Sequence, residues 1–87
     1  MGFEFDEKKS QSNKRKHGID FVEAQKLGED HDRIEVAART ADEPRLLMVG
    51  KIGDDHWSAV FTYREEATRI VSVRRSRQEE IELYEGE

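Results

Sequence analysis

The sequence contains no cysteine and no long hydrophobic run, and it has a single proline. The absence of cysteine excludes disulfides and thiolate metal ligands, and it fits a reducing cytosol. No apolar run is long enough to cross a membrane, and there is no signal-peptide core. We therefore expect a cytoplasmic protein with no membrane partner.

Apolar side chains are also scarce. They make up 34% of the 87 residues, and a chain of this length buries only about 60–65% of its unfolded surface. We expect one small domain spanning residues 1–87, with a thin core that a protein partner can complete.

Several functional motifs are missing as well. There is no glycine-rich phosphate loop, zinc motif or Ser-His-Asp set. His31 stands between Asp30 and Asp32, but no other residues have ligand spacing, so we predict no metal and no cofactor. The net charge of −5 argues against indiscriminate binding to nucleic acid. The basic residues are nevertheless clustered, at residues 14–17 and among the arginines of residues 64–77.

Residues 3–21 organise the rest of the chain. Phe3 and Phe5 have the two-residue period of a strand. Asp6 is placed to cap the N-terminus of a helix over residues 7–17, and Gly18 is placed to end it in a left-handed conformation.

This first helix contains no apolar residue, so we expect it to bury nothing. Spacings of four, three and four residues put one cationic stripe on its surface, and that stripe includes an imidazole that can titrate near neutral pH. The stripe is a candidate RNA-binding surface formed by Lys9, Asn13, Lys16 and His17.

A second helix is expected after Gly18. Asp20 and Glu23 form a capping box, and an apolar stripe runs along the helix to Leu27. Gly28 is expected to end this helix.

Four strand-like segments follow, at residues 33–39, 45–52, 56–63 and 67–75. Short turns at residues 40–44, 53–55 and 65–66 predict an antiparallel meander. A capping box at Ser76 and Glu79 opens a last helix. Because helices and strands do not alternate, the fold class is α+β, with the helices on one face of the sheet and the other face partly open.

Arginines make up the most informative group in the second half. Arg64 ends one strand and Arg69 begins the next, while strict alternation places Arg74 on the face of Ile70 and Ser72. Permanently charged guanidinium groups suit phosphate, so the cluster predicts an anion site, which Arg45 can join. The alternative is that these arginines pair with glutamates on the surface, at Glu35, Glu43, Glu65 or Glu80.

Two other side chains are open to a catalytic or a structural role. His17 is either a general acid or base, or an imidazole that packs beside Gly18. Tyr84 is either a core residue stacked on Ile81 or a hydroxyl that reaches the open face.

Taken together, the residues resemble the BrnT family of toxins from type II toxin–antitoxin modules. The resemblance runs from Phe3 to Tyr84, and its most specific elements are Lys-His-Gly-x-x-Phe at residues 16–21 and Arg-Ile-x-Ser-x-Arg-Arg at residues 69–75. Other matching positions are Phe5, Asp6, Asn13, Glu43, Pro44, Arg45, Gly50, Tyr63, Arg64 and Glu80. The chain departs from the family at Phe5, where tryptophan is frequent, and at residues 27–28.

The resemblance implies a RelE-like fold and a ribonuclease that blocks translation by cutting RNA, either free or on the ribosome. It implies a cognate, BrnA-like antitoxin that binds operator DNA, so that the toxin reaches DNA only through a toxin–antitoxin heterotetramer. It also implies functional positions at Lys16, His17, Arg64, Arg69, Ser72, Arg74 and Tyr84. We expect metal-independent catalysis by these residues other than Ser72, and RNA binding by Lys9, Asn13, Arg45, Ser72 and Arg75.

Two hypotheses compete with the ribonuclease. A non-catalytic nucleic-acid-binding module would use the same basic patches and bind RNA without cutting it. A purely structural protein, completed by its partner, would neither bind RNA nor arrest growth.

Overall fold

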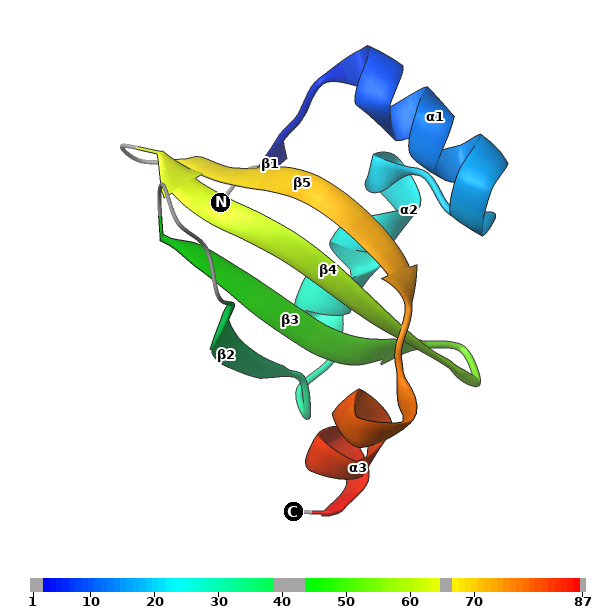
Figure 1. Cartoon of the computed structure of the whole chain (residues 1–87), viewed down its shortest axis with the longest axis vertical. Helices are drawn as coiled ribbons and strands as arrows, with labels where there is room; N and C mark the ends of the chain where they lie inside the picture. Colours follow the sequence, from blue (N-terminus) through cyan, green and yellow to red (C-terminus); the bar gives the residue numbers. More distant parts are fainter. Residues whose placement is uncertain (1–2, 39–43, 65–66, 87) are drawn as a thin grey trace.

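A computed structural model describes residues 3–38, 44–64 and 67–86 of the chain. The fold is α+β, as predicted, with a five-stranded sheet in the order β1-β5-β4-β3-β2 (Figure 1). In chain order, the elements are β1 (Phe3–Glu4), α1 (Glu7–His17), α2 (Phe21–Ala24), the 3-10 helix η1 (Gln25–Glu29), β2 (Ile34–Ala38), β3 (Arg45–Ile52), β4 (Asp55–Arg64), β5 (Ala67–Arg75) and α3 (Gln78–Gly86).

The last four strands form the predicted antiparallel meander. The short N-terminal strand joins the same sheet, because β1 pairs in parallel with the start of β5. Residues 40–43 of the predicted turn at 40–44, and the predicted turn at residues 65–66, lie outside the described residues, and Glu43 and Glu65 with them. No described helix is long and apolar enough to cross a membrane.

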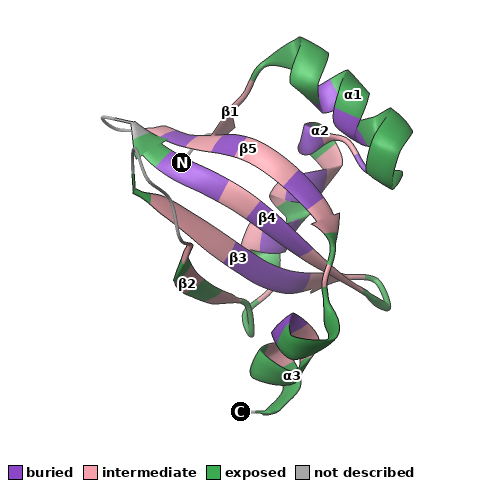
Figure 2. Ribbon diagram, in the orientation of Figure 1, coloured by how far each residue is buried: buried purple, intermediate pink, exposed green. Residues whose placement is uncertain are grey.

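The core lies between the sheet and the segment formed by α2 and η1, which runs behind β4 and β3 in Figure 1. Phe21 and Leu27 from the helices meet Phe61 and Val73 from the strands, and all four are almost fully buried. The buried stripes on β3, β4 and β5 are visible in Figure 2. The thin apolar content is thus concentrated on one face of the sheet.

Local sequence signals fix the helix ends. The Asp6 carboxylate accepts hydrogen bonds from the backbone N–H groups of Lys8 and Lys9, and Gly18 ends α1 with φ of 82°. Asp20 and Glu23 form the predicted capping box. The second helical segment becomes a 3-10 helix that continues through Glu29, one residue past the predicted end.

The C-terminal helix differs from prediction in its start and its position. It begins at Gln78. The carboxylate that accepts a hydrogen bond from the backbone N–H of Arg77, just before the helix, belongs to Glu80 and not to Glu79. Glu80 also bonds Ser58 and Arg74, whose side chains point away from the core residues Ala59 and Val73. The expectation that all helices share one face of the sheet is therefore wrong, because α3 attaches to the opposite face.

A β-bulge in β5 changes the predicted arginine geometry. The register with β4 shifts between Val60 and Phe61, so that Phe61 pairs with Ile70 while Val60 pairs with Ser72. The extra residue, Val71, reverses the alternation, and Val73 follows Ile70 into the core. Strict alternation predicted that Arg74 shares a face with Ile70. That prediction is wrong, because the bulge places the two residues on opposite faces of the sheet. Instead the bulge puts Arg69, Ser72 and Arg74 on the same side of the sheet.

Candidate nucleic-acid interface

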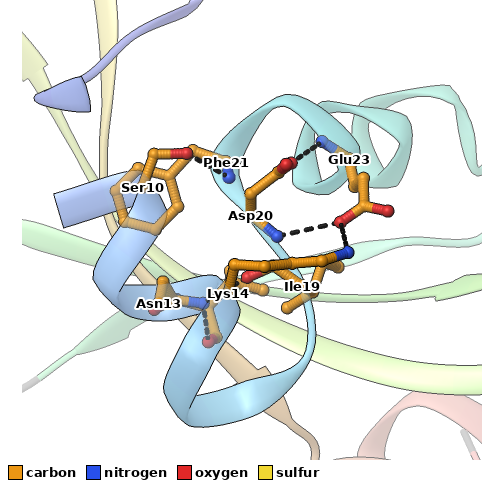
Figure 3. Close-up of polar contacts among 8 residues, drawn as sticks. Ser10, Asn13, Lys14, Ile19, Asp20, Phe21 and Glu23 are labelled. Atoms are coloured by element: carbon orange, nitrogen blue, oxygen red, sulfur yellow. Dashed lines mark hydrogen bonds and ion pairs between the residues drawn. The ribbon is translucent and has the colours of Figure 1, made fainter. Parts of the chain in front are cut away.

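Two buried polar residues fix helix α1 to its neighbours, Ser10 to the start of α2 and Asn13 to the edge of the sheet. The Ser10 hydroxyl accepts a 2.9 Å hydrogen bond from the backbone N–H of Phe21. The Asn13 amide donates to the carbonyls of Ile19 and Val73, at 2.8 Å each, and accepts from the Val73 N–H. Figure 3 shows how these groups join α1 to the start of α2. The expectation that this helix buries nothing is therefore wrong, because it packs through polar rather than apolar contacts.

Asn13 differs from the other members of the predicted stripe. Only 7% of it is exposed, and both ends of its amide are occupied by the backbone. Lys9, Lys16 and His17 are exposed, and no hydrogen bond or ion pair holds their side chains among the described residues. The structure thus anchors the stripe through Asn13 and leaves its charged members open to a ligand.

The exposed basic side chains at the end of α1, Lys16 and His17, lie toward the C-terminal end of β5. Helix α1 follows β1, which is parallel to β5, and Asn13 contacts Val73 near the end of that strand. Lys16 and His17 lie about one helical turn past Asn13. In Figure 1 the end of α1 and the end of β5 are on the same side of the molecule. The structure therefore brings this pair toward the end of the sheet that carries Arg74 and Arg75.

Arg74 is held in an internal ion pair. Its two terminal nitrogens donate to the two carboxylate oxygens of Glu80, at 2.8 Å each. The hydrogen bond from Arg74 is the main cause that lowers the pKa of Glu80 to about 2, and the same bond raises the pKa of Arg74. This is the glutamate pairing expected under the alternative interpretation, and it ties β5 to the first turn of α3.

Arg75 is more accessible. Its guanidinium makes a 2.8 Å ion pair with Asp55 and lies 5.1 Å from the centre of the Trp57 ring. Both partners of the ion pair are more than half exposed. Exposed ion pairs are weak, about 0–1 kcal/mol, so a phosphate can compete with Asp55 for this guanidinium.

A second group of predicted residues lies at the other end of the sheet. Leu46, Phe61 and Ile70 form one row across β3, β4 and β5. Arg45 directly precedes Leu46 and Arg69 directly precedes Ile70, so the two arginines lie next to the ends of this row. Arg69 has a long, 3.9 Å contact with Glu4. Arg64 ends β4 at the same end of the sheet, and Ser72 lies between the two groups on β5. The predicted arginines thus divide between two ends of the sheet.

Tyr84 is hydrogen-bonded to Asp30, which is not among the predicted site residues. Its hydroxyl donates a 2.6 Å hydrogen bond to Asp30, and its ring contacts His56 edge-on. Desolvation, followed by the bond to Asp30, raises the pKa of Tyr84 well above its ordinary value. Asp30 also accepts from the backbone N–H of Lys51. Asp30 therefore joins η1, β3 and α3, and only the tertiary structure reveals this role.

Exposed basic side chains lie together at a fixed helix end although the net charge of the chain is −5, and such a local basic patch is a feature of nucleic-acid-binding surfaces. A family model described as the ribonuclease toxin BrnT of type II toxin–antitoxin systems matches residues 5–80. The chain belongs to this family of ribonuclease toxins, and membership implies a protein antitoxin as partner. Among curated proteins, a search finds no match to the chain.

Proposed function

We propose that this chain cleaves RNA and thereby inhibits translation, with the end of α1 as the centre of its active site. The observation that carries this proposal is the contrast within α1. Ser10 and Asn13 are buried and fix the helix, whereas Lys16 and His17 are exposed and make no internal ion pair within the described residues. Fixed, unpaired polar groups can meet a phosphate without first breaking a contact in the protein.

The chemistry needs no group beyond such side chains. The ribose 2′-hydroxyl attacks the adjacent phosphorus, the bond to the 5′ oxygen breaks, and a 2′,3′-cyclic phosphate forms. A base removes the 2′ proton, an acid protonates the leaving oxygen, and cations stabilise the charge on the phosphoryl oxygens. We assign one of these two proton transfers to His17 and the other to solvent water, and we assign charge stabilisation to Lys16. We expect cleavage without a metal ion.

The arginines are assigned different parts. Arg75 can turn from the exposed Asp55 to a phosphate at the end of β5. Arg69 can bind a more distant phosphate together with Arg45 and Ser72, while Lys9 contacts the strand along α1. Arg74 supports the site structurally, because its ion pair with Glu80 joins β5 to α3. Tyr84 holds α3 in place through its hydrogen bond to Asp30. We keep Arg64 as a candidate cation at the far end of the sheet.

The family assignment also sets the partners that we propose. A BrnA-like antitoxin neutralises the toxin, binds operator DNA and assembles with it as a heterotetramer. The toxin itself contacts RNA in the cytoplasm, free or on the ribosome.

The test is cleavage of a defined RNA by the purified chain in EDTA, with and without ribosomes. We expect His17→Ala to reduce the rate by about 10²–10⁴-fold, the usual contribution of a general acid or base. Lys26→Ala removes an exposed lysine from η1 and is the matched control. Unchanged cleavage by His17→Ala would contradict the assignment.

The alternative of a non-catalytic RNA-binding module is favoured by the state of Arg74, a predicted catalytic residue. Its bidentate ion pair with Glu80 keeps this guanidinium from contacting a phosphate. Under this alternative the wild-type chain binds RNA in a salt-dependent manner but leaves the strand intact.

A further inference from the structure

A cavity of about 400 Å³ opens at the end of the sheet away from Arg75. Phe3, Met48 and Phe61 form its apolar wall, and η1 borders it on one side. The Tyr63 ring stands at this cavity with 60% of the residue exposed, and it packs edge-on against Phe61. The cavity is within the size range of ligand sites, and no residue assigned to RNA cleavage lines it.

The charged groups around the cavity are predominantly acidic. Glu29 and Glu35 supply two carboxylates, against the single guanidinium of Arg33. Arg33 is itself engaged, because it donates to the Asp30 carbonyl at 3.2 Å and to Glu35 at 3.4 Å. The Glu29 carboxylate and the Tyr63 hydroxyl make no hydrogen bond within the described part of the chain. An occupant therefore meets unused acceptors beside an exposed aromatic ring.

These features discriminate between possible occupants. A phosphate is repelled by the two carboxylates. An apolar side chain would desolvate the carboxylates without replacing their hydrogen bonds. A nucleobase would bring its flanking phosphates close to Glu29 and Glu35. A guanidinium avoids these costs, because it stacks on an aromatic ring and donates several hydrogen bonds to carboxylates.

The neighbouring edge of the sheet can hold the backbone that carries this guanidinium. β2 is the last strand in the sheet order, so within the described residues its outer edge pairs with no strand. Glu35 lies on β2 and lines the cavity. An extended segment that added to this edge would place alternate side chains beside Glu35.

We propose that this cavity anchors an arginine side chain of the protein antitoxin, whose backbone adds to the edge of β2. The proposal rests on membership of the toxin family and not on the assignment of the RNA-cleaving residues. An antitoxin bound here contacts the toxin away from the end of α1.

The first test measures binding of a capped Ala-Arg-Ala tripeptide to the isotopically labelled full chain, with NMR chemical shifts as the readout. We expect saturable shifts at the cavity, and affinity at least about tenfold weaker for the same peptide with citrulline, which keeps the shape but lacks the charge. Tyr63→Ala and Glu29→Gln should each weaken the arginine peptide, whereas Glu82→Gln on α3 should not. Equal binding of the citrulline peptide, or no saturable shift, would overturn the proposal. So would binding of guanosine without binding of the peptide.

The second test measures the affinity of the full chain for its purified antitoxin. Tyr63→Ala should weaken the complex by about tenfold or more, as expected for loss of an anchor residue, while cleavage of RNA by the free variant stays at the wild-type rate. Unchanged antitoxin affinity would refute the anchoring role even if cleavage is intact. Loss of cleavage in His17→Ala is a separate outcome that concerns only the proposed active site.

Discussion

The Asn13 side chain bonds both the N–H and the C=O of Val73, and so occupies the place of a neighbouring strand. β1 covers this edge of β5 only at Thr68 and Arg69. Farther along, a helix side chain satisfies the outward-facing backbone of Val73. One residue thus protects the sheet edge and positions the cationic end of α1.

Replacing Asn13 should therefore be costly. Asn13→Ala leaves the backbone groups of Val73 and the Ile19 carbonyl without their partner, and we expect it to lower the free energy of unfolding by roughly 2–4 kcal/mol. Urea unfolding measures this. Ser12→Ala, at an exposed position on the same helix, is the control and should change stability by no more than about 0.5 kcal/mol. A similarly small effect of Asn13→Ala would show that the three hydrogen bonds do not fix α1.

Gly18 permits the chain to leave α1 in a left-handed conformation. Its φ is 82°, and a Cβ atom at this position would have no neighbour within 4 Å, so the cost of a substitution is conformational rather than steric. Gly18→Ala should destabilise the protein by about 1–2 kcal/mol. Gly18→Asn should be milder, because asparagine tolerates this conformation better. Thermal unfolding of the two variants tests this order, and equal stabilities would contradict it.

The Arg74–Glu80 pair predicts a specific acid sensitivity. The pKa of Glu80 is about 2 in the folded protein, against an ordinary value of 4.5. The unfolded chain therefore binds the proton more tightly, so this contribution is complete above about pH 4.5 and is lost as the pH falls toward 2. Its upper limit is about 3 kcal/mol. Stability should fall less steeply over this range in Glu80→Gln than in wild type, and parallel curves would count against the pair.

Tyr84→Phe separates the two interpretations of this tyrosine. We expect a loss of stability of about 0.5–1.5 kcal/mol, because the hydrogen bond to Asp30 disappears. RNA cleavage should remain within about threefold of wild type, well short of the 10²–10⁴-fold loss expected for a general acid or base. The assay is run below the unfolding transition of the variant. A hundredfold loss of cleavage by folded Tyr84→Phe would restore the catalytic interpretation.

The sequence was most informative where the signal is local. The caps at Asp6, Gly18 and Asp20 each depend on residues within one helical turn, and all were predicted correctly. The ranges of β3 and β5 were also predicted, because β-branched and apolar runs end at recognisable turns.

Contacts between distant segments could not be predicted in the same way. Asn13 and Val73 are 60 residues apart, and Asp30 and Tyr84 are 54 apart, so no local pattern joins them. The bulge at Val71 adds one residue to β5 and reverses which side chains enter the core. For that reason the identities of the charged residues were available from sequence, whereas the face of the sheet that carries Arg74 was not.

The most direct test of the central claim is cleavage of a defined RNA in EDTA by wild type, His17→Ala and Lys26→Ala, with ribosomes present and absent. We predict that wild type and Lys26→Ala cut the RNA in at least one condition, whereas folded His17→Ala is slower by about a hundredfold or more. Cleavage by His17→Ala at the wild-type rate would contradict an active site at the end of α1. Salt-dependent RNA binding by the folded wild type without strand scission would instead identify a non-catalytic module.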